Sequence, residues 1–233
     1  EFGAHADWTG AGEITVWPEP YRQRSYFVES DWSAASYWYE MVALSDDPDA
    51  SVRLEGLMDG SKQGDSHVRY LFSMLGVKTT FGSRETGRPT TVTLKKSGRR
   101  SPRIDFDFSG SPDLAQTFVV TCALLGVPFH FRGLQTLRIK ETDRIAALKK
   151  EMQKMGFRLQ EANGSELIWN GEREPAAADF AIDTYEDHRM ALAFAPAALK
   201  SGRPLRINNP QVVSKSYPNF WNDLRQMGFN VSS

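Results

Sequence analysis

The sequence predicts an α/β fold, in the broad sense that includes α+β, built from repeated β-α-β-α-β-β units around an approximate threefold axis. Three amphipathic stretches end at Gly76, Gly156 and Gly228, and successive glycines are 80 and 72 residues apart. Glycine tolerates the left-handed conformation that ends many helices. Strand-like and helix-like segments precede each glycine in the same order. The spacing and the order together indicate one supersecondary unit that repeats along the chain.

The elements follow from local patterns, taken in chain order. Alternating apolar residues predict strands, apolar residues three and four apart predict helices, and Asp31 is a favoured N-cap. In the first unit we expect a strand at 26–29, a helix at 31–44, a strand at 51–56, a helix at 65–75 and a hairpin at 78–81 and 90–95. In the second we expect a strand at 104–108, a helix at 113–125, a strand at 129–133, a helix at 142–155 and a hairpin at 158–161 and 166–169.

The third unit is expected to lack its hairpin. It has a strand at 180–183, a helix at 188–199, a strand at 205–208 and a helix at 217–227. Residues 1–28 are expected to be a remnant hairpin, with strands at 4–6 and 13–17, and a crossover from a preceding domain. Residues 29–233 then form the three-unit domain. We therefore expect a piece of a longer protein; the alternative is that residues 1–28 are an ordinary N-terminal hairpin.

Composition and charge exclude several classes of protein. The chain is 40% hydrophobic, with 14 Phe, 7 Tyr and 6 Trp, so it can bury a core. Its formal charge of −1 argues against a broad nucleic-acid surface. No apolar run is long enough to span a membrane. Cys122 is the single cysteine, which rules out an internal disulfide and favours a reducing compartment, the cytoplasm. We expect no metal and no cofactor.

Charged groups recur where helices of the second and third units are expected to begin. A helix N-terminus attracts anions, because its free N–H groups carry partial positive charge. Lys140 and Arg144 are four residues apart, which would place them on one helical face. The residues concerned are Asp113, Lys140, Glu141, Arg144, Arg189 and Lys215.

Each of these segments also has an ordinary interpretation. Residues 140–144 could be a solvated first turn capped by Thr142, Pro112 and Asp113 a plain helix start, and Lys215 part of a surface loop. Around a threefold axis, however, these helix starts would meet at one end of the domain. The sequence therefore favours a compact anion site with built-in acid and base groups.

These residues resemble the 5-enolpyruvylshikimate-3-phosphate synthase family. The most specific strings are Lys-Glu-Thr-Asp-Arg at 140–144 and Asp-His-Arg-Met-Ala at 187–191. Residues 29–37, 112–113 and 215–218 match in the same order, so the resemblance covers essentially the whole chain. It implies the enolpyruvyl transferase fold: two domains of three units each, whose helix ends face a shared cleft. This chain would be the C-terminal domain, without the preceding domain that completes the site.

The resemblance also implies an activity and a role for each site residue. The reaction transfers the enolpyruvyl group of phosphoenolpyruvate to the 5-hydroxyl of shikimate 3-phosphate and releases phosphate, in the pathway to chorismate and the aromatic amino acids. The implied catalytic residues are Asp113, Glu141 and Lys215. Those implied at shikimate 3-phosphate are Asp113 and Lys140, and those at phosphoenolpyruvate are Arg144, Arg189 and Lys215. Either Glu141 or Lys215 could donate the proton to the methylene carbon.

Two rival functions stay open at this point. One is a non-catalytic anion-binding or assembly domain on the same scaffold, which would be expected to lose charges from the site. The other is an enolpyruvyl transferase whose acceptor is a nucleotide sugar.

Overall fold

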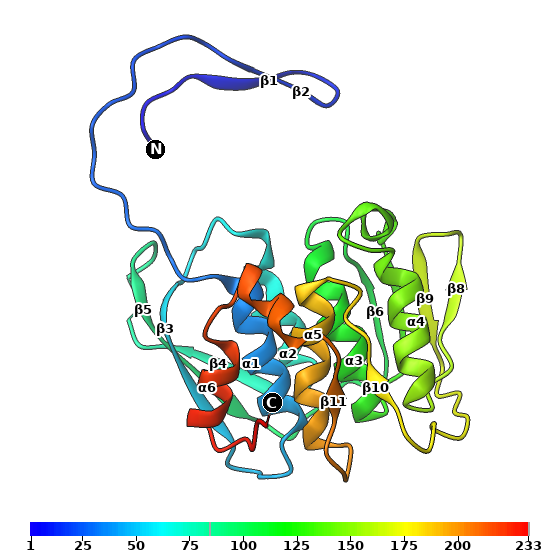
Figure 1. The fold of residues 1–233 in the computed structure, drawn as a ribbon. Helices are drawn as coiled ribbons and strands as arrows, with labels where there is room; N and C mark the ends of the chain where they lie inside the picture. The colour runs from blue at the N-terminus through cyan, green and yellow to red at the C-terminus, as the bar shows by residue number, and fades with distance from the viewer. Residues whose placement is uncertain (84, 233) are drawn as a thin grey trace.

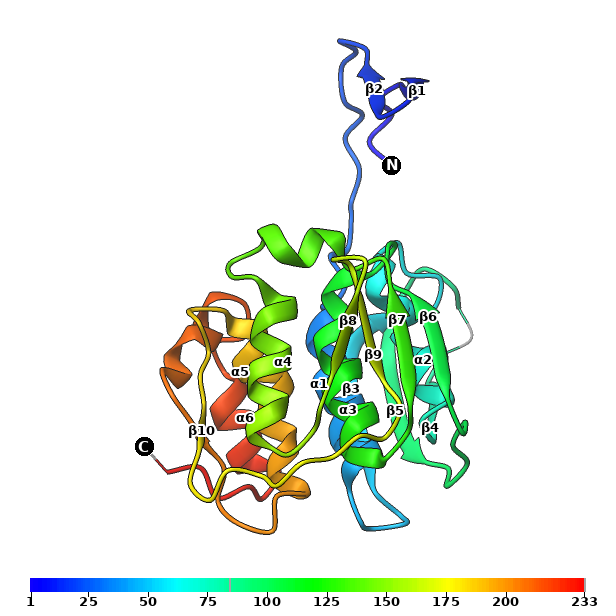
Figure 2. The same ribbon diagram turned by 90° about the vertical axis from the view of Figure 1, so that its right-hand side faces the viewer.

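The computed structural model describes residues 1–83 and 85–232, and it begins with a separate hairpin. Strands β1 (Ala6–Gly10) and β2 (Glu13–Val16) pair antiparallel, with Ala6 opposite Val16. Nearly every residue of the hairpin is exposed. Figures 1 and 2 both show the hairpin standing apart from the rest of the chain, joined to it by the stretch that leads into helix α1.

Unit one has a three-stranded antiparallel sheet in the order β3-β5-β4. Its elements are α1 (Trp32–Leu44), β3 (Ser51–Met58), the 3-10 helix η1 (Gly64–His67), α2 (Val68–Ser73), β4 (Val77–Phe81) and β5 (Pro89–Lys96). Asp31 caps α1, as predicted, and accepts a hydrogen bond from the Ser33 backbone N–H at 2.9 Å. Among the described strands, β3 pairs with β5 alone, so its other edge carries no strand.

Unit two has the complete four-stranded sheet, in the order β6-β7-β9-β8. Its elements are β6 (Ile104–Asp107), η2 (Pro112–Leu114), α3 (Ala115–Leu125), β7 (Phe129–Arg132), η3 (Gln135–Ile139), α4 (Arg144–Lys154), β8 (Gln160–Ala162) and β9 (Glu166–Trp169). Strands β6 and β7 run parallel, as a β-α-β crossover requires, and β9 pairs antiparallel with both β7 and β8.

Unit three has only a short parallel pair, β10 (Ala181–Ile182) and β11 (Arg206–Ile207). Its remaining elements are α5 (His188–Phe194), η4 (Ala195–Leu199), η5 (Pro210–Lys215) and α6 (Phe220–Gln226). Within the described residues, α6 is the last helix or strand. Residue 233, the last of the predicted domain, lies outside the described residues.

The hydrophobic core lies between the sheets and includes the first helix of each unit, which are α1, α3 and α5. Helix α3 packs against both α1 and α5, and the three helices lie in the middle of Figure 1, between the sheets of units one and two. The fully buried Phe118 of α3 joins the helices to unit one, because its ring centroid is 4.5 Å from that of Phe72. Apolar burial therefore fixes the first helices side by side, and the residues that begin them are brought together.

The predicted glycine caps are confirmed. Gly76, Gly156 and Gly228 have φ values of +85°, +84° and +90°, in the left-handed region. A side chain at Gly156 would also be 2.6 Å from the backbone oxygen of Glu174. Glycine is required at this helix end both by conformation and by space.

The strand predicted at 26–29 is wrong. These residues form no strand, and Tyr26, Phe27 and Val28 are 52%, 60% and 80% exposed. The pattern is apolar enough for a strand, but the segment does not lie along the open edge of β3. Just after the segment, the Ser30 N–H donates a backbone hydrogen bond to the Gly56 carbonyl oxygen of β3 at 2.9 Å. A strand needs a partner strand, which its own sequence cannot supply.

Several predicted boundaries also move, for reasons of backbone chemistry. The helix predicted at 188–199 becomes 3-10 after Phe194, because Pro196 has no N–H to donate. The helices predicted at 65–75 and 113–125 each begin with a 3-10 turn, η1 and η2. The helix predicted at 217–227 begins at Phe220, since the residue before Pro218 disfavours helical conformation. Strands predicted at 158–161, 180–183 and 205–208 lie in the expected places with shifted ends, whereas the strand predicted at 4–6 overlaps β1 only at Ala6.

Candidate active site

The site begins with two aspartates that cap helices. Asp143 caps α4, accepting from the Ala146 N–H at 3.1 Å, so the predicted cap at Thr142 is wrong. Asp187 caps α5 and accepts from the Arg189 N–H at 2.9 Å. Because helical side chains tilt toward the N-terminus of their helix, the side chains that follow each cap are directed toward that end of the domain.

Arg144 lies at the centre of the site, with its side chain only 2% exposed. Its Nε bonds to Asp187 Oδ2 at 2.6 Å and its Nη1 to Asp113 Oδ1 at 2.9 Å. Its Nη2 bonds to Glu141 Oε2 at 2.7 Å and to Asp187 Oδ1 at 3.3 Å. One buried guanidinium therefore holds three carboxylates. These carboxylates come from the starts of α3, α4 and α5, which confirms the predicted meeting of helix starts.

Asp113 is shared by three cations. Besides Arg144, it accepts from Arg189 Nη2 at 3.0 Å and lies 3.5 Å from Lys140 Nζ. Burial by itself would raise the pKa of Asp113, but the charges of Arg189, Arg144 and Lys140 outweigh it and lower the pKa. Lys140 precedes α4 rather than belonging to it, so the predicted shared helical face with Arg144 is wrong. The two residues meet at Asp113 instead.

Glu141 and Lys215 form the accessible side of the cluster. Lys215 Nζ bonds to Glu141 Oε1 at 2.6 Å, and the Lys215 side chain is 59% exposed. This hydrogen bond is the largest of the effects that lower the pKa of Glu141 to about 2. At neutral pH Glu141 is therefore a carboxylate. The pair joins unit two to unit three across 74 residues of sequence.

His188 lies beside this pair, but it is not engaged by it. Its Nδ1 is buried without a hydrogen-bond partner among the described residues, 3.9 Å from Glu141 and 3.8 Å from Asp187. Burial, followed by the charge of Arg189, lowers its pKa despite these two carboxylates. Within residues 1–83 and 85–232, no three His, Cys, Asp or Glu side chains are grouped as metal ligands.

The structure adds residues that sequence reasoning missed. Asp187 was not predicted as a site residue, although its position two residues before Arg189 is that of an N-cap. Unit one contributes Tyr37 and Asp65, which both help to raise the pKa of Arg189. A signal for Asp65 was available, because it stands at the start of the second helix of its unit, as Glu141 does.

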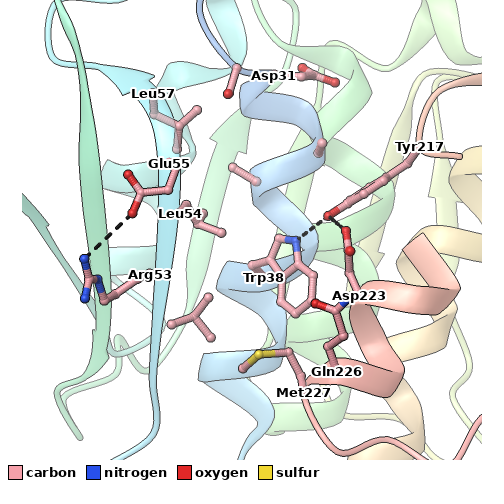
Figure 3. Close-up of a pocket in the computed structure, with 14 residues that line it drawn as sticks. Asp31, Trp38, Arg53, Leu54, Glu55, Leu57, Tyr217, Asp223, Gln226 and Met227 are labelled. Atoms are coloured by element: carbon pink, nitrogen blue, oxygen red, sulfur yellow. Dashed lines mark hydrogen bonds and ion pairs between the residues drawn. The ribbon is translucent and has the colours of Figure 1, made fainter. Parts of the chain in front are cut away.

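The best-formed pocket lies elsewhere, between α1, β3 and α6 (Figure 3). It has a volume of about 330 Å³, and none of the predicted site residues lines it. At its wall, Trp38 Nε1 donates to the Tyr217 hydroxyl at 3.1 Å, which donates to Asp223 at 2.8 Å (Figure 3).

The family described as EPSP synthase (3-phosphoshikimate 1-carboxyvinyltransferase) matches residues 1–224. A 3-phosphoshikimate 1-carboxyvinyltransferase of Bacteroides fragilis (strain YCH46) is 56% identical over 231 residues, which cover 99% of this chain and 54% of that protein. That of Burkholderia multivorans is 34% identical over 228 residues, covering 94% of this chain and 49% of that protein.

The fold comparison agrees with the sequence comparison. A solved structure of EPSP synthase from Acinetobacter baumannii superposes with a TM-score of 0.76 at 21% identity, covering 99% of this chain and 53% of that one. The predicted fold class is thus confirmed. The chain spans about half the length of the curated relatives it matches. No described helix has the length and hydropathy needed to cross a bilayer. The match over residues 1–224 and the 56% identity to the Bacteroides protein establish that this chain belongs to the EPSP synthase family.

Proposed function

We propose that this chain forms one wall of an active site that transfers the enolpyruvyl group of phosphoenolpyruvate to the 5-hydroxyl of shikimate 3-phosphate and releases phosphate. The observation that carries the proposal is the Arg144 network, in which one buried guanidinium holds Asp113, Glu141 and Asp187 together. Three further cations, Lys140, Arg189 and Lys215, border the same carboxylates. Anionic substrates and acid-base chemistry need this combination of charges in one place.

Substrate binding is proposed as an exchange of carboxylates. Arg144 is too buried, and too fully bonded, to meet a ligand unless one of its acids leaves. The Asp113 carboxylate bridges Arg144 and Arg189, so it occupies the place that the carboxylate of phosphoenolpyruvate would take. Entry of that carboxylate would release Asp113 to face the hydroxyls of shikimate 3-phosphate, with Lys140 beside it.

The proton transfers are assigned from the state of the Glu141 and Lys215 pair. Because Glu141 is ionised at neutral pH, the proton available to the methylene carbon is on Lys215, and Glu141 orients it. Protonation leaves the adjacent carbon cationic, and the 5-hydroxyl oxygen adds to it while Asp113 accepts the hydroxyl proton. Phosphate then leaves the tetrahedral carbon, the new methyl group returns a proton to the pair, and the double bond is restored.

The remaining groups needed for this reaction are proposed to lie outside this chain. Coverage of about half of each curated relative supports a second domain, which would form the opposite wall, and the predicted division at residues 28 and 29 fits that arrangement. With one wall only, water stays at the site, and charges that act strongly in a closed site act weakly. We therefore expect this chain alone to be inactive. A cytoplasmic location is proposed on the single buried thiol, Cys122.

The test is phosphate release from phosphoenolpyruvate in the presence of shikimate 3-phosphate. The protein assayed is a full-length fusion, in which this chain replaces the matching part of the Bacteroides fragilis relative. The fusion is expected to be active and this chain alone inactive. Activity with a nucleotide sugar but not with shikimate 3-phosphate would favour the rival transferase. Binding of both anions without phosphate release would favour the non-catalytic domain.

A further inference from the structure

A turn with an unfavourable backbone conformation leads into helix α5. The Asp187 backbone N–H donates to the Thr184 carbonyl oxygen at 2.8 Å. The two residues between them, Tyr185 and Glu186, have φ values of +52° and +56°. Turns with positive φ at both central positions favour glycine, asparagine or aspartate, because larger side chains crowd the backbone in this conformation. A turn made by tyrosine and glutamate therefore needs contacts elsewhere in the molecule to hold it.

The contact that holds the turn comes from Glu151 of helix α4. The Glu151 side chain is 0% exposed, and its Oε1 accepts a hydrogen bond from the Tyr185 hydroxyl at 2.5 Å. Its Oε2 accepts from the Asp183 N–H at 3.0 Å and from Lys154 Nζ at 2.7 Å. Burial, followed by the hydrogen bond to Glu151, raises the pKa of Tyr185, so the hydroxyl keeps the proton that it donates. One buried carboxylate therefore ties the turn and the residue before it to α4.

Helix α4 holds the segment that precedes α5 at two points. Arg144 is the first residue of α4, and its Nε bonds to Asp187 Oδ2 at 2.6 Å. Glu151 follows seven residues later, two helical turns away, and therefore lies on the same face of the helix. Lys154, in the last turn, also bonds to Asp183 Oδ2 at 2.8 Å. The spacing of these contacts along one helix fixes where the turn lies relative to the charged cluster.

We propose that Glu151 is a positioning residue for the phosphoenolpyruvate site. Through the Tyr185 hydroxyl it holds the strained turn, and the turn sets where Asp187 and Arg189 lie. Asp187 in turn orients the Arg144 guanidinium. The inference rests on the proposed function, in which Arg144 and Arg189 receive the carboxylate of phosphoenolpyruvate. Loss of the Tyr185 hydroxyl should therefore weaken the binding of phosphoenolpyruvate more than that of shikimate 3-phosphate.

The first measurement is amide hydrogen exchange in this chain, followed by NMR, and it needs no activity. The variant Tyr185→Phe removes one hydroxyl and keeps the ring. We expect the amides of Asp187 and Arg189 to exchange about tenfold faster, because both donate within the turn or its cap and local opening becomes easier. The matched control is Tyr39→Phe, since the Tyr39 hydroxyl lies 2.8 Å from Thr79 Oγ1 in unit one. Exchange at both amides as slow in Tyr185→Phe as in Tyr39→Phe would overturn the proposal.

A second variant separates the turn from a general loss of stability. Glu186 is exposed and has positive φ, so Glu186→Gly should relieve the strain at that position. In the double variant Tyr185→Phe with Glu186→Gly, exchange at Asp187 and Arg189 should return part of the way to that of the unmutated protein. If the double variant exchanges as fast as Tyr185→Phe alone, the hydroxyl does not act by holding the turn, and the proposal fails.

The second measurement is steady-state kinetics of the full-length fusion. Tyr185→Phe is expected to raise the KM for phosphoenolpyruvate about tenfold and that for shikimate 3-phosphate less than about twofold, both below the roughly 10²-fold that a 1 Å misplacement can cost. Addition of Glu186→Gly should lower the KM for phosphoenolpyruvate again. Equal changes in the two KM values, or no change in either, would refute a positioning role. An inactive unmutated fusion would instead count against the proposed function, and the exchange rates would still decide the role of Glu151.

Discussion

Replacing Arg144 by methionine tests whether the network is held by one buried charge. The guanidinium contacts three carboxylates, but they do not depend on it equally. Asp113 would keep Arg189, and Glu141 would keep Lys215. Asp187 is 0% exposed, and without Arg144 its carboxylate would keep the Arg189 backbone N–H at 2.9 Å and the His188 Nδ1 at 3.8 Å. The loss of stability in Arg144→Met should therefore come mainly from Asp187, whose buried charge loses its partner.

The expected loss in the free energy of unfolding follows from the burial of Asp187. Removing one partner of a buried ion pair costs about 3–5 kcal/mol, because the other charge stays buried without compensation. A matched control is Arg138→Met, since Arg138 is 32% exposed and pairs with Asp143 and Glu161, which are 38% and 24% exposed. Such a pair is worth about 0–1 kcal/mol. Arg144→Met is thus expected to lower the free energy of unfolding several times more than Arg138→Met.

The assay is urea unfolding of this chain, followed by tryptophan fluorescence. The double variant Arg144→Met with Asp187→Asn should recover much of the loss at neutral pH. A loss below about 1 kcal/mol, which is what an exposed pair contributes, would refute the reasoning. So would a double variant no more stable than the single one.

Four further outcomes are expected. In the full-length fusion, Asp113→Asn should lower kcat by about 10²–10⁴, the usual contribution of a general base, and near-normal turnover in the phosphate assay would remove it from the mechanism. Arg189→Lys should raise the KM for phosphoenolpyruvate more than that for shikimate 3-phosphate, since lysine lacks the planar fork; equal changes in steady-state kinetics would contradict this. Lys215→Met should move the Glu141 pKa from about 2 back toward 4.5 in a carbon-detected NMR titration. The stabilisation from this pair, present above pH 4.5 and lost as the pH falls toward 2, should then disappear from acid unfolding curves. Burial raises the pKa of Glu40 well above 4.5, so its contribution to stability is present at low pH and lost as the pH rises above 4.5. Glu40→Gln should therefore make the free energy of unfolding less sensitive to rising pH. The same pH dependence of urea unfolding in the variant and the unmutated protein would argue against this.

Much of this protein could be predicted from local sequence. Gly76, Gly156 and Gly228 mark helix ends, because few other residues accept positive φ. Asp31 indicates where α1 begins, because a short polar side chain can accept from the free N–H groups of the first turn. These features depend on a few neighbouring residues, so a repeat of them along the chain predicts a repeat in the fold.

The sequence also identified most of the charged site. Asp113, Lys140, Glu141, Arg144, Arg189 and Lys215 all lie in one connected cluster. What it could not predict was the partner of each charge, such as Asp187 for Arg144 across 43 residues. It also missed Asp65 of unit one, whose charge acts on the pKa of Arg189 in unit three.

The failed strand at 26–29 and the buried state of Arg144 have the same explanation. Periodicity records which side of a segment is apolar, but not what lies against that side. A strand forms only where another strand offers its N–H and C=O groups, and a charge is buried only where other elements bring opposite charges to it. Local propensity acts over a few residues and can be read along the chain. Pairing across the chain is decided by the packing of the helices around the core, and it exists only in the tertiary structure.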